Sequence, residues 1–342
     1  MEILKEKILI IQTAFLGDAI LTLPMIQQLK EKLPASSITV LCIPSTKELF
    51  EKSSVIDDVI VYDKRNTQKS ILSLFVLILS IRKKKYLIVY SPHKSSRSAI
   101  IAFLSGAKLT YGFDSASMSF LYTNQIKYQK SDHEVARNLK LIGMEETNVN
   151  WKILPQLEID SETNAKIESK LKMFNFIKIA AVAPGSVWAT KIYPKEYFIK
   201  VIQYLLSENY FIILIGGKED QDLCAEIEKK FSESVKSFAG LLNVPESICL
   251  LKHCSFLISN DSAPTHFGMI ADIPTITIYC STVSAFGFYP YNGKSFFISY
   301  DDLACKPCGI HGHQECPIKT FDCGYKLFPE IIISKLKEKN IL

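Results

Sequence analysis

The stretch KILIIQTAFLGDAILTLP, residues 7–24, decides the fold. It begins with an apolar run that has the length of one buried strand, and it continues through Gly17 and Asp18 into a segment of helical length. A short buried strand that turns directly into a helix is the first half of a βαβ unit, from which parallel sheets are built. The sequence therefore predicts a parallel sheet whose faces are covered by helices.

The same alternation of short apolar runs and helical segments extends along the chain in two blocks. The predicted strands are residues 7–11, 38–43, 59–63, 86–90 and 109–113, then 177–183, 211–215, 235–238, 256–259 and 275–279. The predicted helices are residues 19–33, 46–52, 70–82, 96–104 and 134–142, then 195–207, 220–231, 245–254 and 264–271. The pattern loosens between residues 122 and 157, and the irregular stretch that ends at Pro155 predicts a linker.

A chain of 342 residues is larger than a single hydrophobic core usually grows, so two domains are expected. We predict the α/β class, with two Rossmann-like doubly wound domains that face a central cleft. The first covers residues 1–155 and the second residues 170–326, and a C-terminal helix in residues 327–342 is expected to pack back towards the first. Ligands bind beyond the carboxyl ends of the strands in such sheets, so the cleft is the expected site.

Several classes of protein are disfavoured by what the sequence lacks. No predicted strand is followed by GxxxxGK[ST] or GxGxxG, which weighs against P-loop NTPases and dinucleotide-dependent dehydrogenases. The first residues lack the apolar core of a signal peptide, which predicts a cytoplasmic protein. The apolar run at residues 71–81 is shorter than the roughly 20 residues that span a bilayer. It predicts a buried helix, with a helix that rests on a membrane surface as the alternative.

Four loops follow predicted strands and carry candidate site residues. In the first loop, Asp18 is either a reactive carboxylate or a helix cap. The second loop, at residues 183–191, combines a hydroxyl, backbone amides and a lysine that suit a phosphate. The third, at residues 216–220, contains two glycines that permit close approach of a ligand or form a simple turn. The fourth loop, at residues 259–266, leads into a helix. Either the amino terminus of this helix binds a diphosphate, or the loop only caps the helix.

Taken together, these loops resemble those of one known family. The motifs are FLGDAILTLP (15–24), APGSVWATKIYP (183–194), IGGKED (215–220), FAGLLNVPE (238–246) and ISNDSAPTHFGMIADIPTITIY (258–279). They resemble the bacterial heptosyltransferases of glycosyltransferase family 9, over nearly the whole chain and in the same order. The resemblance implies a GT-B fold and an inverting transfer of heptose from ADP-heptose to the inner core of lipopolysaccharide or a related glycolipid. It also implies a cytoplasmic protein that is peripheral on the inner face of the inner membrane.

The resemblance further implies roles for single residues. Asp18 is the general base of the acceptor-binding first domain, and Lys191 contributes to catalysis by binding phosphate. The implied donor-binding residues of the second domain are Ser186, Lys191, Glu219, Gly240, Leu241, Asp261, Ser262, Ala263 and His266. Our acceptor-binding candidates are basic residues that follow strands of the first domain, although each also suits a solvated surface: Lys64, Arg65, Lys94 and Arg97. No cofactor is expected, because Lys191 and the helix amides near Ser262 can stabilise the leaving ADP.

Four clustered cysteines stand outside this scheme: Cys305, Cys308, Cys316 and Cys323. Their spacing is that of an imperfect zinc ribbon with a single CxxC, so a structural zinc site and reduced packing thiols are both open. Two other functions are also open, a nucleotide-sugar 2-epimerase of the same fold and a zinc-ribbon nucleic-acid-binding protein. The mild net charge of +5, without an aromatic-interleaved basic stripe, predicts no nucleic-acid partner. The basic runs suit an anionic membrane surface instead.

Overall fold

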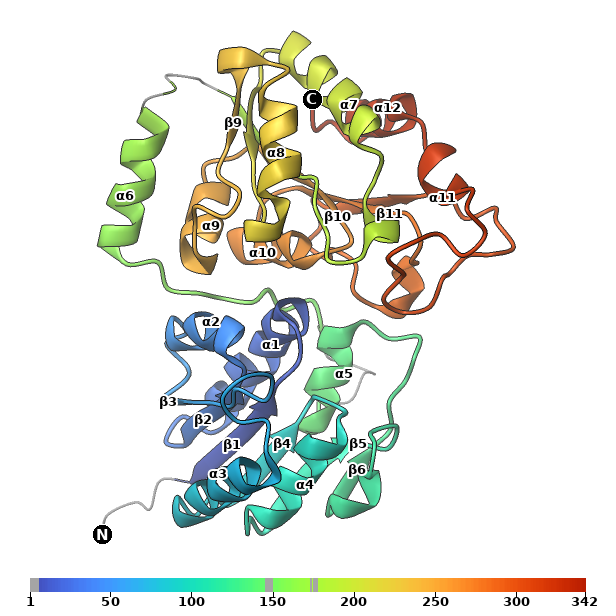
Figure 1. Cartoon of the computed structure of the whole chain (residues 1–342). Helices are drawn as coiled ribbons and strands as arrows, with labels where there is room; N and C mark the ends of the chain where they lie inside the picture. The colour runs from blue at the N-terminus through green and yellow to red at the C-terminus, as the bar shows by residue number, and fades with distance from the viewer. Residues whose placement is uncertain (1–5, 145–149, 173, 175–177) are drawn as a thin grey trace. The chain divides into compact units, whose positions relative to one another are not determined.

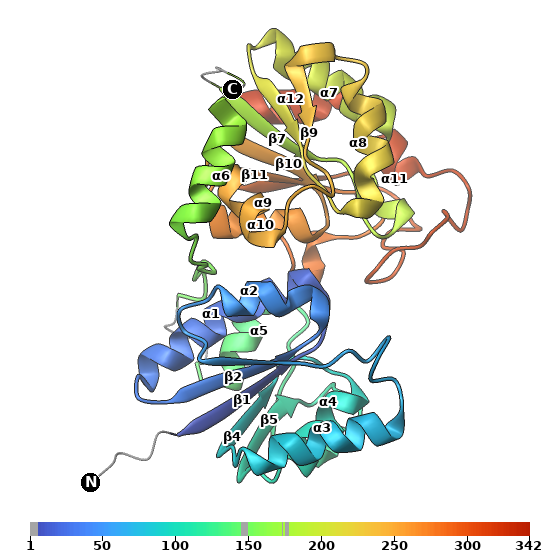
Figure 2. The same ribbon diagram turned by 60° about the vertical axis from the view of Figure 1, so that its left-hand side comes forward.

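The computed structural model describes residues 6–144, 150–172, 174 and 178–342. The chain divides into two compact units, Met1–Glu158 and Ile159–Leu342. Each unit contains a six-stranded parallel sheet with helices on both faces (Figures 1 and 2). The predicted α/β class with two Rossmann-like units is therefore confirmed.

The sheet of the first unit has the order β3-β2-β1-β4-β5-β6. Its strands are β1 (Lys7–Gln12), β2 (Ser37–Cys42), β3 (Asp58–Val61), β4 (Ile88–Ser91), β5 (Leu109–Phe113) and β6 (Asn124–Ile126). Its helices are α1 (Leu16–Lys32), α2 (Lys47–Glu51), α3 (Ile71–Lys83), α4 (Ser96–Leu104) and α5 (Glu134–Leu141). Helices α1 and α5 pack together on one face of the sheet, and α3 and α4 lie side by side on the other (Figure 2). Ile8 to Ile11 of β1 are wholly buried because both faces are covered.

The second unit repeats this plan with the order β12-β11-β10-β7-β8-β9. Its strands are β7 (Ile179–Ala183), β8 (Phe211–Leu214), β9 (Val235–Ser237), β10 (Phe256–Asn260), β11 (Thr275–Tyr279) and β12 (Phe296–Ser299). Its helices are α6 (Ser161–Lys172), α7 (Lys195–Ser207), α8 (Gln221–Glu228), α9 (Val244–Leu251), α10 (Ala263–Ala271), α11 (Asp322–Tyr325) and α12 (Pro329–Glu338). Helices α7, α8 and α12 cover one face, and α6, α9 and α10 cover the other (Figures 1 and 2).

In both sheets the direction of winding reverses once, and this creates a topological switch point. The reversal falls between β1 and β4 in the first unit and between β7 and β10 in the second. The two central pairs are in register, for example Ile8 with Ile88 and Ala183 with Ser259. Loops that leave the carboxyl ends of such a pair diverge to opposite faces and leave a crevice, where doubly wound proteins bind their ligands.

All ten predicted strands are present, although the first residue of the strand predicted at 177–183 and residues 145–149 of the predicted linker lie outside the described residues. The sequence did not predict β6, β12, α6 or α11. Helix α12 packs on α7, and its Ile332 and Leu336 are wholly buried in the core of the second unit. The expectation that the C-terminal helix packs back towards the first domain stays a prediction.

Helix α3 corrects one expectation, since it is not a buried helix. Only Leu77, Ile78 and Ile81 are buried, whereas Ile71 is 85% and Leu72 is 79% exposed. The helix therefore has an inner apolar stripe that faces the sheet and an outer apolar stripe that faces away from it. Within the described part of the chain, no helix is long and apolar enough to cross a membrane.

We predict that Gly268→Ala destabilises the second unit. A Cβ atom at Gly268 of α10 would lie 2.0 Å from Oγ1 of Thr275, a fully buried residue whose hydroxyl donates to the Ile273 carbonyl. Overpacking of this kind costs about 1–3 kcal/mol, which lowers the melting temperature by roughly 2–10 °C. Gly293→Ala is the matched control, because that position is exposed and a Cβ there meets nothing within 4 Å. Equal melting temperatures for the two variants would contradict this account of how α10 packs on β11.

Candidate functional site

Asp18 lies at the switch point of the first unit, in the first turn of α1 directly after β1. The helix start is fixed by buried side chains, since Gln12 donates from Nε2 to Oγ1 of Thr22 at 2.7 Å. The Thr22 hydroxyl in turn donates to the backbone carbonyl of Asp18 at 2.8 Å. The first turn of α1 is thus tied to the end of β1, and the position of the Asp18 backbone is set by the core beneath it.

The interpretation of Asp18 as the helix N-cap is wrong. The N-cap residue is Phe15, and Asp18 is the third residue inside the helix. A carboxylate in the first turn still interacts favourably with the helix dipole, by about 0.3–1 kcal/mol. The side chain is half-buried.

The structure brings the four predicted acceptor-binding residues together along this edge. Nζ of Lys64 donates to the Thr13 carbonyl at 2.7 Å, and the pKa of Lys64 is lowered by burial and then by the charges of Arg65 and Arg97. Burial, with the charges of Lys64 and Lys94, also lowers the pKa of His93 to about 4. His93 is therefore neutral near pH 7, and this edge carries four basic side chains around one neutral imidazole.

Lys94 forms the link between this basic cluster and Asp18. Its Nζ lies 3.4 Å from the centroid of the Tyr128 ring, a cation–π contact. Tyr128 is held by the buried Arg137, whose guanidinium donates to its hydroxyl at 2.8 Å. Burial lowers the pKa of Lys94, while the negative charges of Glu134 and Asp18 act in the opposite direction. A carboxylate and a cation therefore share the switch point of the first unit.

In the second unit, an ion pair occupies the switch point. Nζ of Lys191 lies 2.7 Å from Oδ2 of Asp261, and each side chain is only 12% exposed. Lys191 also donates to the Asp261 carbonyl at 3.2 Å, and the hydroxyl of Thr282 donates to Oδ2 at 2.7 Å. Lys191 follows β7 and Asp261 follows β10, so two predicted donor-site residues 70 positions apart meet at this edge.

Asn260 holds the loop that carries Lys191. This wholly buried side chain donates from Nδ2 to the carbonyls of Pro184 at 2.7 Å and Gly185 at 3.3 Å. Its Oδ1 accepts the backbone N–H of Tyr193 at 3.0 Å. Both ends of the loop at residues 184–193 are thus fastened to the last residue of β10.

Beside the ion pair, α10 presents its amino terminus. Ser262 is the N-cap residue and Ala263 the first helical residue, and both are half-buried. A helix amino terminus favours an anion, and the candidate donors here are the amides of Ser262 and Ala263, because Pro264 has no N–H and the Thr265 amide donates to the Ser262 carbonyl at 3.1 Å. His266 is buried one turn later, and its Nδ1 has no hydrogen-bond partner among the described residues. Burial lowers its pKa to about 4, with the charge of Asp261 acting in the opposite direction, so the ring is neutral near pH 7.

Three glycine-containing loops converge at the same edge around Asp220, which sequence reasoning missed. A Cβ atom at Gly185 would lie 1.9 Å from Oδ1 of Asp220, and one at Gly216 would lie 2.6 Å from Oδ2. The amide of Gly240 donates to the Gly216 carbonyl at 3.0 Å. The remaining donor-site candidates sit on these loops: Ser186, half-buried, and Glu219 and Leu241, both exposed. Glycine at positions 185 and 216 therefore leaves room for the Asp220 carboxylate, which lies against both loops.

The cysteine-rich segment contributes to the same edge in a way that the sequence did not predict. The backbone of His313 exchanges hydrogen bonds with Thr190, through its carbonyl at 3.0 Å and its amide at 2.8 Å. The His311 ring stacks on Trp188 with a centroid distance of 6.0 Å. Burial and then the charge of Lys191 lower the pKa of His311, while the charge of Asp261 acts in the opposite direction. No motif in the sequence connects His311 with Lys191.

The four clustered cysteines are free thiols. Burial acts to raise the pKa of Cys316, but hydrogen bonds from nearby backbone amides, Phe321 first, bring it below its usual value. Within the described residues, which include all four cysteines, no group of three or more His, Cys, Asp or Glu side chains is placed to hold a metal ion. The hypothesis of a structural zinc site therefore gains no support from the geometry.

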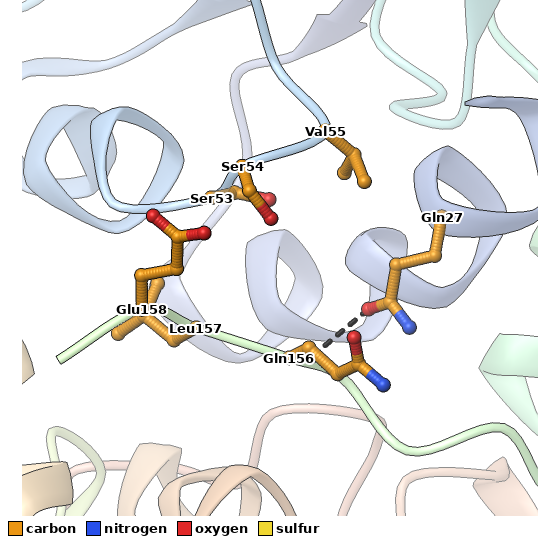
Figure 3. A pocket seen from close by; sticks show the side chains of 7 residues that line it. All are labelled: Gln27, Ser53, Ser54, Val55, Gln156, Leu157 and Glu158. Carbon is orange, nitrogen blue, oxygen red and sulfur yellow. Dashed lines mark hydrogen bonds between the residues drawn. The ribbon is translucent and has the colours of Figure 1, made fainter. Parts of the chain in front are cut away.

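A cavity of about 300 Å³ lies in the first unit, away from the candidate residues (Figure 3). The residues that line it are Gln27, Ser53, Ser54, Val55, Gln156, Leu157 and Glu158. Gln27 accepts the amide of Gln156 at 2.9 Å and donates to the Leu154 carbonyl at 3.1 Å, which fastens residues 154–158 to α1. Of the seven lining residues only Glu158 is ionisable, so the cavity offers little for catalysis.

Comparison with known proteins agrees with the two-unit plan. The chain is 25% identical over 338 residues to lipooligosaccharide heptosyltransferase 2 of Campylobacter jejuni, covering 97% of this chain and 98% of that protein. The structure of this chain matches that of a family 9 glycosyltransferase of Veillonella parvula with a TM-score of 0.84 at 22% identity. The match covers 99% of this chain and 98% of that chain. The structure also matches that of E. coli ADP-heptose LPS heptosyltransferase II with a TM-score of 0.78 at 18% identity, covering 97% and 98% of the two chains. These likenesses confirm the predicted GT-B fold.

The family itself is established by sequence. The profile of glycosyltransferase family 9 (heptosyltransferase) matches residues 74–319, which is more than two thirds of the chain. The matched range includes the described edge residues of the second unit, whereas Asp18, Lys64 and Arg65 of the first unit precede it. The match confirms the expected family and class of enzyme. The chain belongs to glycosyltransferase family 9, the heptosyltransferase family, and is a glycosyltransferase.

Proposed function

We propose that this enzyme transfers heptose, with inversion, from ADP-heptose to the inner core of lipopolysaccharide or a related glycolipid. The observation that carries the proposal is the Lys191–Asp261 ion pair beside the amino terminus of α10. A cation and a helix amino terminus at one switch point suit a nucleoside diphosphate. The similar proteins named above are a lipooligosaccharide heptosyltransferase and an ADP-heptose LPS heptosyltransferase, which supports the choice of donor and acceptor.

The donor binds to the second unit in this proposal. Lys191 contacts the diphosphate while Asp261 and Asn260 hold the lysine and its loop, and the amides at Ser262 and Ala263 and the hydroxyl of Ser186 complete the phosphate site. Glu219 is exposed and can accept hydrogen bonds from the sugar hydroxyls. Gly240 and the 61% exposed Leu241 lie beside the nucleotide base. His266 stays neutral behind the phosphate site.

The acceptor binds to the first unit, and Asp18 is its general base. An alcohol is a poor nucleophile, so a carboxylate must accept its proton as the new glycosidic bond forms. The hydroxyl oxygen attacks the anomeric carbon, the bond from that carbon to ADP breaks, and the proton passes to Asp18. A single displacement inverts the anomeric centre. Lys64, Arg65, Lys94 and Arg97 neutralise the phosphates and carboxylates of the acceptor.

The leaving ADP carries the negative charge that develops in the transition state. Lys191 and the amides of α10 supply the matching positive charge at fixed positions, which is the arrangement that stabilises such a transition state most effectively. We propose that transfer therefore needs no cofactor. The enzyme works in the cytoplasm, peripheral on the anionic inner face of the inner membrane, because its acceptor is a glycolipid.

The donor is tested by a thermal-shift panel of ADP-, UDP- and GDP-sugars with the intact protein. We expect ADP-heptose and ADP to raise the melting temperature by several degrees at saturating concentration, since a ligand at 100 times its Kd stabilises by about 2.7 kcal/mol. An assay of ADP release with a lipopolysaccharide core acceptor then measures transfer, with and without EDTA. Stabilisation by UDP-sugars alone, or isomerisation of a UDP-sugar without transfer, would favour a 2-epimerase instead.

Asp18→Asn tests the general base. The amide has the same size but cannot accept the proton, so we expect kcat to fall by about 100-fold or more. Affinity for ADP should be unchanged, because the phosphate site is in the other unit. The helix loses at most about 1 kcal/mol. Glu31→Gln on the same helix is the control, and near wild-type turnover by Asp18→Asn would mean that the carboxylate serves only the helix.

Lys191→Met tests the charge at the phosphate site. It keeps the aliphatic stem and removes the cation, so we expect kcat to fall by about 100-fold, the usual effect of removing one donor to a developing negative charge. Titration calorimetry should also show weaker binding of ADP. Lys195→Met is the matched control, because that lysine pairs with Glu226 on the surface at 2.7 Å. A Lys191→Met enzyme with unchanged kcat would remove this lysine from the mechanism.

A further inference from the structure

We propose that the outer face of α3 is the surface on which the protein docks to an anionic lipid bilayer. We define the outer α3 face as Ile71, Leu72, Phe75, Val76 and Leu79. Their side chains are exposed by 85%, 79%, 53%, 66% and 43%. These positions follow the spacing i, i+1, i+4, i+5, i+8, so they form one stripe along the helix.

The stripe is not a by-product of core packing. The side chains that pack against the sheet are Leu77, Ile78 and Ile81, which occupy a different side of the same helix. A helix on the surface of a globular unit ordinarily presents polar residues to solvent. A contiguous exposed apolar patch of this kind marks an interaction site.

Helix α4 carries a further exposed apolar side chain. It packs beside α3 on the same face of the sheet, as both views show (Figures 1 and 2). Phe103 of α4 is 57% exposed. The helix next to α3 therefore also presents an apolar side chain to solvent.

The charges around the outer α3 face indicate that its partner is an anionic bilayer. Residues 64–85 contain seven basic side chains and no acidic one, namely Lys64, Arg65, Lys69, Arg82, Lys83, Lys84 and Lys85. Arg65 and Lys69 are exposed before the helix begins, and Arg82 to Lys85 are exposed at its end. An apolar stripe with cations at both ends complements anionic headgroups above an acyl layer. A second copy of the chain would bring like charges together, which disfavours a dimer through this face.

The length of α3 determines how the helix would lie in a bilayer. Its 13 residues extend about 20 Å, well short of the roughly 30 Å hydrocarbon core, so the helix lies in the interface and does not span it. Its first turn follows the loop of Lys64 and Arg65. The following consequence rests on the proposed function: a glycolipid acceptor held in the same bilayer would meet these two residues at the level of the headgroups.

The test is co-sedimentation of the full chain with vesicles that contain 30% phosphatidylglycerol in phosphatidylcholine, and with vesicles of phosphatidylcholine alone. We expect binding to the anionic vesicles that weakens as salt is raised. We expect the partition coefficient onto anionic vesicles to fall at least 10-fold in a four-residue variant, Leu72→Gln/Phe75→Gln/Val76→Gln/Leu79→Gln. We expect most of the preference for anionic over neutral vesicles to be lost in Lys83→Gln/Lys85→Gln. Ile318→Gln/Ile331→Gln is the matched control in the second unit, where both isoleucines are exposed.

Three outcomes would overturn the proposal: equal binding by the four-residue variant and the wild type, no binding of the wild type to either vesicle, or a wild-type dimer in light scattering that the four-residue variant abolishes. Transfer to a water-soluble core oligosaccharide should be unchanged in the four-residue variant. Because vesicle binding is measured without donor or acceptor, its failure is distinct from a failure of the proposed activity.

Discussion

The switch-point edge of the second unit depends on one buried side chain, Asn260. Its amide bonds to the backbone at both ends of the loop at residues 184–193 and has no exposed surface. A buried amide that lost these partners would cost about 1–3 kcal/mol, so the loop has one favoured arrangement. That arrangement brings Lys191 to Asp261 and sets both against the first turn of α10. The cation and the helix amides are therefore in position before any ligand arrives, and no reorganisation is needed when charge develops.

The same topology is used twice, and the two copies carry different chemistry. In the first unit the loops after β1 and β4 provide a carboxylate and a group of cations around Lys94. In the second unit the loops after β7 and β10 provide a paired cation and helix amides. The family membership makes the chain a group-transfer enzyme, and such an enzyme has to bind two substrates. Under the proposed function, the two switch points with distinct electrostatics each bind one of the two substrates.

Most of the fold could be predicted from the sequence because the central strands are continuous apolar runs. The missed strands are short and lie at sheet edges, and β6 consists of Asn124, Gln125 and Ile126, which carry almost no apolar signal. The candidate site was predicted less completely. Asp18 could be located, yet its place inside the first turn depends on Phe15 beginning the helix. The contacts of Asp220 with Gly185 and of His311 with Trp188 join distant segments, and no local pattern encodes them.

Helix α3 shows why the sequence alone could not decide between burial and exposure. Its inner and outer stripes are both apolar, so its periodicity does not reveal which side meets the sheet, and only the packing of Ile78 and Ile81 does. The basic residues of the chain look dispersed along the sequence. Those of residues 64–85 nevertheless lie directly before this helix and at its end, and Lys64 also donates to the Thr13 carbonyl beyond the end of β1. The basic loop before α3 thus connects the exposed apolar face to the switch point that holds Asp18.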